Sequence, residues 1–298
     1  MALRLGTAEP NSTFLTQGLA LKTVLDRDTA LGPCDIRVTP QASIQNALAL
    51  HAGELDFGFM AANWIGRAKN GEAPFTAPID LRMVAPMNAG PLYFIARPDS
   101  SLRTVAGLRG KRVAVGLSSS GMAQHARVMF GVFGLTDDIE PHYLDFAAGA
   151  EAVLSGAVDA QLQCPIPNKV MTELCARTPI KVLPYADGTL DALLAAVPYY
   201  RRTVMRKGAL RGLDADVDQP AVVNVLVTHA RTSEATARTL TATVIAAAEE
   251  LGGLNPLFAG LDALIRDLAS GGRAQFEFGG VALHPGALAA YRDAGLLA

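Results

Sequence analysis

The chain has 298 residues, half of them hydrophobic, and a formal net charge of −2. Near-neutral charge without a basic run argues against nucleic acid or an anionic membrane surface as the main partner. The apolar runs are all shorter than the roughly 20 residues of a membrane span, and the length predicts two domains of roughly 150 residues each.

The first part of the chain alternates between predicted strands and predicted helices. Strands are expected over residues 3–5, 35–39 and 55–60, helices over 13–26 and 44–52, and extended runs over 79–87 and 92–96. This alternation predicts an α/β fold with mainly parallel sheets flanked by helices. The segment from Asn88 to Pro91 is the predicted crossing between two lobes.

The middle of the chain repeats this alternation, and its end is helical. Strands are expected over residues 112–115, 142–144, 160–163, 180–183 and 222–228, and helices over 121–133, 148–154, 168–177, 190–196, 233–251, 256–270 and 286–296. We therefore predict a discontinuous first lobe of residues 1–88 and 204–298 and an inserted second lobe of residues 89–203. The crossings near residues 88–91 and 199–206 are the predicted hinges.

Two stretches about a hundred residues apart have the same design. RLGTAEPNST leads into FLTQGLALKTVL, and KRVAVGLSSSG leads into MAQHARVMFGVF, so each is a strand, a Ser/Thr/Gly turn and a helix. Each is followed by a Gly-x-x-Asp turn, at Gly53 to Asp56 and at Gly156 to Asp159. Two such lobes that aim helix N-termini at a shared cleft would grip a small polar or anionic ligand.

The candidate ligand-binding residues lie on these turns and at two strand ends. Hydroxyl groups and the free amides of a first helical turn are the groups that would bind such a ligand. The alternatives are plain helix caps for the turns and core packing for the strand ends. The candidates are Thr7, Ala8, Glu9, Asn11, Ser12 and Thr13 in the first turn, Ser118, Ser119, Ser120, Gly121 and Met122 in the second, and Asn63, Trp64, Gln163 and Cys164 at the strand ends.

Catalytic and metal-binding patterns are missing from the sequence. Cys34, Cys164 and Cys175 have no C-x-x-C spacing, and the five histidines are scattered without an i, i+4 pair. Around Ser119 the G-x-S-x-G motif of serine hydrolases fails, and no phosphate-binding loop is present. We expect no metal, no cofactor and no enzymatic activity.

Several segments, in the same order along nearly the whole chain, resemble one family. They are LGTAEP, ASIQNALALHAGELDFGFM, LRTVAGLRGKRVAVGLSSSG, AEAVLSGAVDAQLQC, VPYYRRTV, KGALRGLDADVDQPAVV and the closing ALHPGALAAYRDAGL. The chain resembles the TAXI solute-binding proteins, the extracytoplasmic receptors of one branch of TRAP transporters. It departs from them in the first turn, which lacks their glycine-rich sequence, and at Ala61 to Trp64, where relatives tend to have Gln-Ser-Asp-Trp.

The resemblance implies a type II periplasmic-binding-protein fold, with two lobes that close on a solute. It also implies a small carboxylate or amino acid as solute, a membrane permease as partner and a periplasmic location. The chain contains no secretory signal, so we expect either that a leader was removed or that the protein is cytoplasmic. An enzyme or a cytoplasmic sensor on the same scaffold is the alternative.

Overall fold

The computed structural model describes residues 2–10, 12–118 and 120–298, and these form two compact units. Unit 1 contains residues 1–89 and 223–298, and unit 2 contains residues 90–222. Two of the candidate residues, Asn11 and Ser119, lie outside the described residues. No described helix is both long and apolar enough to cross a bilayer.

Unit 1 is built on a mixed sheet in which β1 (Leu3–Gly6) lies between two parallel neighbours. These neighbours are β2 (Cys34–Arg37) and β3 (Phe57–Ala61). The strand β11 (Val217–His229) runs antiparallel to β3, and β4 (Leu81–Pro91) pairs with β11. The carboxyl ends of β1, β2 and β3 therefore meet at one edge, where ligands of open α/β sheets bind.

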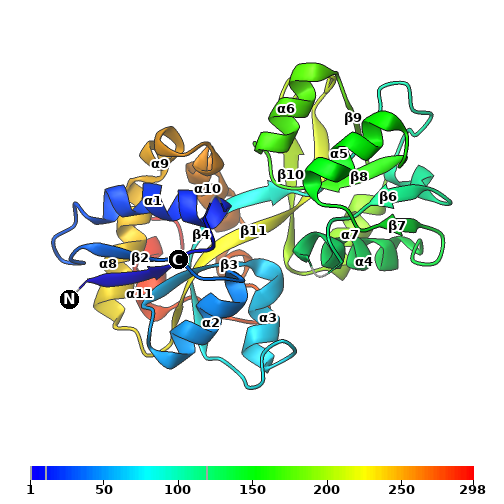
Figure 1. Ribbon diagram of the computed structural model, residues 1–298. Helices are drawn as coiled ribbons and strands as arrows, with labels where there is room; N and C mark the ends of the chain where they lie inside the picture. The colour runs from blue at the N-terminus through cyan, green and yellow to red at the C-terminus, as the bar shows by residue number, and fades with distance from the viewer. Residues whose placement is uncertain (1, 11, 119) are drawn as a thin grey trace. The chain divides into compact units, whose positions relative to one another are not determined.

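Helices cover both faces of this sheet. In Figure 1, α1 lies above the strands labelled β2 and β3, and α2 lies below them. The stacked rings of Phe14 and Phe59, 5.4 Å apart, join α1 to β3. The helices of unit 1 are α1 (Thr13–Leu25), α2 (Ser43–Ala52), α3 (Ala62–Asn70), α8 (Glu234–Ala246), α9 (Ala248–Leu254), α10 (Leu261–Ser270) and α11 (Pro285–Asp293), with short 3₁₀ turns at Pro256–Phe258 and Arg273–Phe276.

Unit 2 contains a five-stranded sheet of order β7-β6-β8-β5-β9. Strand β6 is parallel to β7 and to the central strand β8, and β5 is antiparallel to β8 and β9. The strands are β5 (Tyr93–Ala96), β6 (Arg112–Ala114), β7 (Glu140–His142), β8 (Ala160–Gln163) and β9 (Lys181–Leu183). The helices are α4 (Gly121–Phe133), α5 (Phe146–Ser155), α6 (Lys169–Arg177) and α7 (Thr189–Ala196), with a 3₁₀ turn at Val105–Leu108.

The boundary between the units differs from the predicted one. The chain passes from one unit to the other within β4, after Ala89, and within β11, after Val222. Residues 204–222, which the sequence assigned to the first lobe, belong to unit 2. The reason is the strand β10 (Tyr200–Met205), which pairs antiparallel with the first half of β11, from Tyr200 opposite Val222 to Met205 opposite Val217.

Several elements differ from the sequence prediction. The helix α3 and the strand β10 were not predicted, and the helix predicted over residues 233–251 is interrupted at Ala247, where α8 ends and α9 begins. Strand β10 was missed because two arginines interrupt its apolar pattern. Helix α3 was missed because it follows β3 with no turn residue between them. The alternation of strands and helices is otherwise as predicted, and it confirms the α/β class.

The duplicated design extends to an ion pair that closes each αβ unit. In unit 1, Arg4 at the start of β1 donates to both carboxylate oxygens of Asp56, at 3.0 and 2.7 Å. In unit 2, Arg112 at the start of β6 donates to both oxygens of Asp159, at 3.2 and 2.9 Å. Both arginines also hold the carbonyl of the glycine in the Gly-x-x-Asp turn. The predicted repeat is therefore a repeat of side-chain contacts as well as of sequence.

Both aspartates contribute stability that depends on pH. Burial raises the pKa of Asp56, but the hydrogen bonds from Arg4 outweigh it and the net pKa is lowered; the bond from Arg112 lowers the pKa of Asp159. A carboxyl group whose pKa is lower in the folded protein stabilises the fold at pH values above its pKa in the unfolded chain, which is about 4. This stabilisation is lost as the pH falls through the pKa of the folded state.

We expect Asp56→Asn and Asp159→Asn each to lower the free energy of unfolding by about 1 kcal/mol at pH 7. Each should also reduce the loss of stability between about pH 5 and pH 2. Urea titrations over this range check both, and Asp99→Asn is the control because its side chain is 74% exposed. Wild-type pH dependence in both variants would contradict the role of the ion pairs.

Candidate functional site

The two predicted turns end in the same kind of helix cap. Ser12 precedes α1 and Ser120 precedes α4, with φ and ψ of −76° and 158° in the first and −75° and 158° in the second. Each serine Oγ accepts a hydrogen bond of 3.2 Å, from the backbone N–H of Leu15 and of Ala123, respectively. The alternative reading of a helix cap is therefore correct for these two hydroxyls. Each hydroxyl keeps its own proton, which can still be donated to a ligand.

Replacing either capping serine by alanine should lower the free energy of unfolding by about 1 kcal/mol, whereas aspartate at the same position should keep most of the stability. Urea denaturation of Ser12→Ala, Ser120→Ala and the two aspartate variants measures this. Ser155 is the control, because its hydroxyl donates to a carbonyl in the last turn of α5 and caps no N-terminus. An equal loss in Ser155→Ala and Ser120→Ala would contradict the cap assignment.

The other candidates on the turns have varied surroundings. Thr7 is buried, and its hydroxyl donates to the carbonyl of Arg37 at 3.0 Å, so it joins the ends of β1 and β2. Ala8 is also buried, whereas Glu9 is exposed. In the second turn Ser118 is exposed. Thr13, Gly121 and Met122 are half-buried.

Asn46 of α2 is a central residue of this edge that the sequence analysis missed. Its side chain is 0% exposed, and Nδ2 donates to the carbonyls of Thr7 and Phe59, each at 2.8 Å. Its Oδ1 accepts from the hydroxyl of Thr39 at 2.9 Å. One amide thus joins the carboxyl ends of β1, β2 and β3. Gly6 is required here, because a Cβ at that position would lie 2.4 Å from Asn46 Oδ1.

Unit 2 also has an amide where the equivalent helix and strand meet, but there the amide is on the strand and the glycine is on the helix. Counting from the equivalent turn glycines, Gly53 and Gly156, the position of Asn46 corresponds to Gly149. The strand position that corresponds to Gly58 is Gln161, whose Nε2 donates to the carbonyl of Phe146 at 2.9 Å. Unit 1 therefore has its amide on the helix and glycine on the strand, and unit 2 has the opposite.

A second set of amides lies within unit 1. Gln17 of α1 is 0% exposed, and its Nε2 donates to Asn88 Oδ1 on β4 at 3.1 Å. Asn224 of β11 donates to the same oxygen at 3.2 Å. Among the described residues, Gln17 Oε1 has no hydrogen-bond partner although it is buried. A buried acceptor without a donor is unfavourable by about 1–3 kcal/mol unless a ligand or water supplies the donor.

Asn63 and Trp64 lie on the first turn of α3, directly after β3. The strand residue before them, Ala61, is the register partner of Asn224. The Oδ1 of Asn63 is buried and also has no partner within the described part of the chain. Trp64 is half-buried, and the guanidinium of Arg67 lies 5.5 Å from its ring centre. Asn63 therefore resembles Gln17 as an acceptor without a donor.

Gln163 and Cys164 end β8 in unit 2. Gln163 is buried and donates to Gln161 Oε1 at 3.0 Å, while its own Oε1 lacks a partner among the residues described. The thiol of Cys164 lies 3.7 Å from the carbonyl of Gly90, and burial raises its pKa to about 12. Gln163 can therefore accept a further hydrogen bond, whereas Cys164 remains a protonated thiol at neutral pH.

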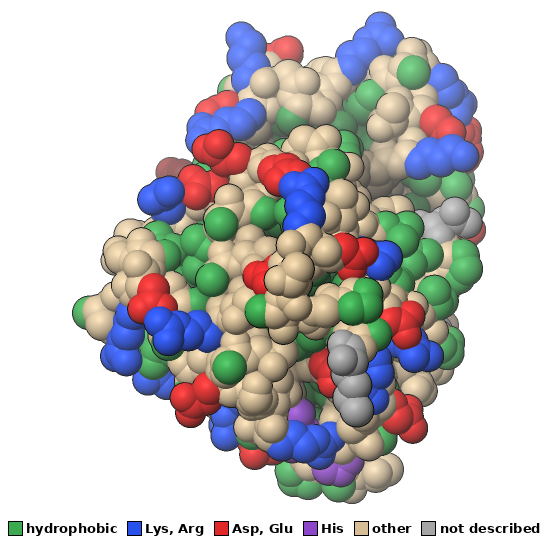
Figure 2. Space-filling view, turned by 90° about the vertical axis from the view of Figure 1, so that its left-hand side faces the viewer, with side chains coloured by type: hydrophobic (Ala, Val, Ile, Leu, Met, Phe, Trp, Pro, Cys, Tyr) green, Lys and Arg blue, Asp and Glu red, His purple; other side chains and the backbone are tan. Residues whose placement is uncertain are grey.

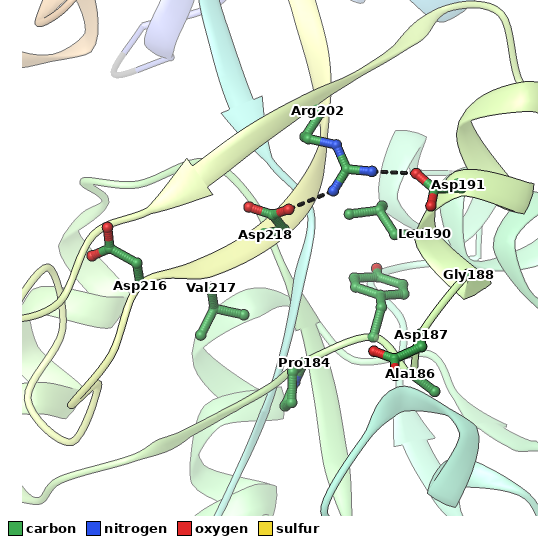
Figure 3. Close-up of a pocket in the computed structure, with 11 residues that line it drawn as sticks. Pro184, Ala186, Asp187, Gly188, Leu190, Asp191, Arg202, Asp216, Val217 and Asp218 are labelled. Atoms are coloured by element: carbon green, nitrogen blue, oxygen red, sulfur yellow. Dashed lines mark hydrogen bonds and ion pairs between the residues drawn. The ribbon is translucent and has the colours of Figure 1, made fainter.

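A separate cavity of about 300 Å³ lies in unit 2 between β9, α7 and β11. Figure 3 shows Arg202 between Asp191 and Asp218, with an ion pair to each. Asp187 and Asp216 also line the cavity, so acidic groups exceed basic ones. Arg202 is the only cation among the described lining residues and is paired with two carboxylates, and none of the described sequence-predicted residues lines this cavity. This cavity is not the predicted site.

Charged side chains do not gather into a patch of one sign on the face that Figure 2 presents. Figure 2 shows Lys and Arg side chains mixed with Asp and Glu over the face it presents, which agrees with the small net charge. Within the described ranges, no group of three or more His, Cys, Asp or Glu residues could hold a metal ion.

Comparison with solved structures shows which fold the chain has. The aliphatic sulphonate-binding protein SsuA of Escherichia coli matches with a TM-score of 0.53 and 19% identity, over 88% of this chain and 78% of that one. A TctC solute-binding protein from Polaromonas matches with 0.56 and 16%, over 88% of each chain. A structure from work on glutathione import via GshT and the cystine importer TcyBC of Streptococcus mutans matches with a TM-score of 0.52 and 10% identity, over 88% of this chain and 96% of that one.

These likenesses and the two α/β units define the fold as that of the two-lobed periplasmic binding proteins. The predicted fold class is confirmed. Within it, the chain belongs to the NMT1-like family, whose model matches residues 5–295.

Proposed function

We propose that the protein is an extracytoplasmic solute receptor of a TRAP-type transporter, which delivers its solute to a membrane permease. The solute is a small organic acid or an amino acid, bound by groups at the carboxyl edges of the sheets. The NMT1-like family and the fold of periplasmic binding proteins support a receptor. The resemblance to TAXI sequences supports the TRAP-type transporter.

The observation that carries the proposal is the set of buried amide oxygens without a donor. The proposal uses three of them, Gln17 Oε1 and Asn63 Oδ1 in unit 1 and Gln163 Oε1 in unit 2. A fourth, Gln219 Oε1 on β11, belongs to a side chain whose Nε2 donates to the carbonyl of Leu183 on β9. Folded proteins rarely keep such acceptors without a partner, because each is unfavourable by about 1–3 kcal/mol. A bound solute with N–H or O–H donors removes this penalty.

The two kinds of group at these edges suit the two ends of an amino acid. The first turns of α1 and α4 offer backbone N–H groups and serine protons, which bind a carboxylate. The amide oxygens accept hydrogen bonds from an ammonium group. Exposed Glu9 adds a negative charge beside the α1 turn. Among small organic acids, an amino acid therefore uses more of these groups than a simple carboxylate does.

We further propose that the protein binds its solute without chemical change. The thiol of Cys164 has a pKa raised to about 12, so it is not a nucleophile near neutral pH. His125 is buried, which lowers its pKa to about 4, and its Nδ1 lies 2.8 Å from the hydroxyl of Tyr200. These surroundings support a structural role for both side chains.

A thermal-shift screen with amino acids and small carboxylates tests the receptor proposal. A solute at 100 times its Kd stabilises the folded state by about 2.7 kcal/mol, which raises the melting temperature by several degrees. Nuclear magnetic resonance of the recovered solute then shows whether it is unchanged. A folded protein that no member of the panel stabilises, or turnover of the solute, would contradict the proposal.

A further inference from the structure

A second cavity of unit 2 has a different character from the acidic one. It has a volume of about 200 Å³ and lies between α4 and the sheet edge at β7. Its walls are mainly apolar and include Ala123, Ala126 and Phe130 of α4 and Ile139 before β7. We call it the α4–β7 cavity. An apolar cavity of about 150 Å³ is large enough to hold a benzene molecule, so this one admits a six-membered ring with a substituent.

Two side chains at this cavity give it polarity. Arg127 lines the cavity from α4 and is exposed. Its guanidinium lies 3.5 Å from the carbonyl of Ser118, which is a long hydrogen bond. In the part of the chain that the structure describes, Arg127 forms no ion pair, whereas Arg109, Arg112 and Arg177 of the same unit do. Tyr143 also lines the cavity and is 45% exposed.

This combination selects one class of ligand. An apolar space next to a cation without a counter-ion fits a molecule with an apolar body and a single negative charge. No described acid forms an ion pair with Arg127: Asp138 pairs with Arg109, and Oε1 of Glu140 lies 3.1 Å from Nε2 of His142. We propose that the α4–β7 cavity binds a small aromatic or short-chain aliphatic monocarboxylate, with its body against α4 and its carboxylate at Arg127.

The site uses other side chains than the one in the proposed function, although Ala123 lies in the first turn of α4. It lies along the body of α4, from Ala123 to Phe130, and contains none of the amide acceptors described above. Either proposal can therefore fail without the other.

Isothermal titration with benzoate and its neutral analogue benzamide, at up to about 10 mM, tests the inference. Arg127→Gln should weaken benzoate about fivefold and leave benzamide unchanged, since an exposed ion pair contributes at most about that factor. Arg103→Gln is the control, because Arg103 is exposed and does not line the cavity. Ala126→Leu fills the cavity and should abolish binding of both compounds.

Absence of benzoate binding to the wild type, or unchanged binding to Ala126→Leu, would overturn the inference. Methyl nuclear magnetic resonance of the wild type gives an independent result that does not depend on the folding of a variant. Benzoate should cause ring-current shifts at the methyl groups of Ala123, Ala126 and Ile139. Shifts confined to other methyl groups would place benzoate elsewhere and overturn the assignment.

Discussion

Asn46→Ala is expected to lower the free energy of unfolding by about 3 kcal/mol. The side chain is fully buried, and the substitution removes donors from the carbonyls of Thr7 and Phe59 and the acceptor of the Thr39 hydroxyl. Each group left unpaired in the interior is unfavourable by about 1–3 kcal/mol, and partial relaxation or water recovers some of this. Urea denaturation measures the change.

Asn70 provides the matched control for this substitution. It is an exposed asparagine on another helix of unit 1, and its amide donates to the side chain of Glu72. Asn70→Ala should change the free energy of unfolding by less than about 0.5 kcal/mol. Similar small losses in both variants would contradict the conclusion that Asn46 holds the three strand ends together.

The second large effect concerns binding. Gln17→Met is expected to raise the Kd of the solute found in the screen by about tenfold to a hundredfold, because it removes a buried acceptor that the solute would pair with. Methionine has a similar volume, and the lost amide makes one internal bond, to Asn88. The free energy of unfolding without solute should therefore fall by no more than about 1.5 kcal/mol.

Gln45→Met separates this effect from a general effect of the substitution. Gln45 is half-buried on α2, another helix of unit 1. Its replacement should leave the Kd within about twofold of the wild type. Calorimetric titration of both variants gives the comparison, and equal Kd values for them would remove Gln17 from the binding site.

The sequence was sufficient to predict most strands and helices, the duplicated turns and the fold class. The Ser12 and Ser120 turns were recognisable because each combines a strand end, small polar residues and an apolar helix within a short segment. The partner of each Gly-x-x-Asp aspartate was not predictable in this way. Arg4 meets Asp56 because β1 and β3 are neighbours in the sheet, and that adjacency is a property of the topology.

Gln17 and Asn46 were missed although the sequence contains a signal for them. The buried face of α1 includes Phe14, Gln17, Gly18 and Leu21, and that of α2 includes Ser43, Asn46, Ala47 and Leu50. Both follow the i, i+3, i+4, i+7 spacing of a core-facing stripe. An amide on such a stripe must find a partner in the interior, so Gln17 and Asn46 were candidates for polar contacts at the sheet edge.

Residues that depend on contacts between distant segments could not be assigned from the sequence. Gln163 was a candidate from the sequence, but only the structure shows that its Nε2 donates to Gln161 and that its Oε1 has no partner among the described residues. The transfer of residues 204–222 to unit 2 depends on the pairing of β10 with β11, whose register the sequence does not encode locally.

Hydrogen–deuterium exchange with and without saturating solute is the most direct test that the first turns of α1 and α4 bind the solute, because it reports on the backbone amides of both turns at once. We expect slower exchange in the first turns of α1 and α4 and around Asn63, with little change in the C-terminal helices α10 and α11. Protection limited to other segments, with unchanged exchange at both turns, would contradict this role of the turns.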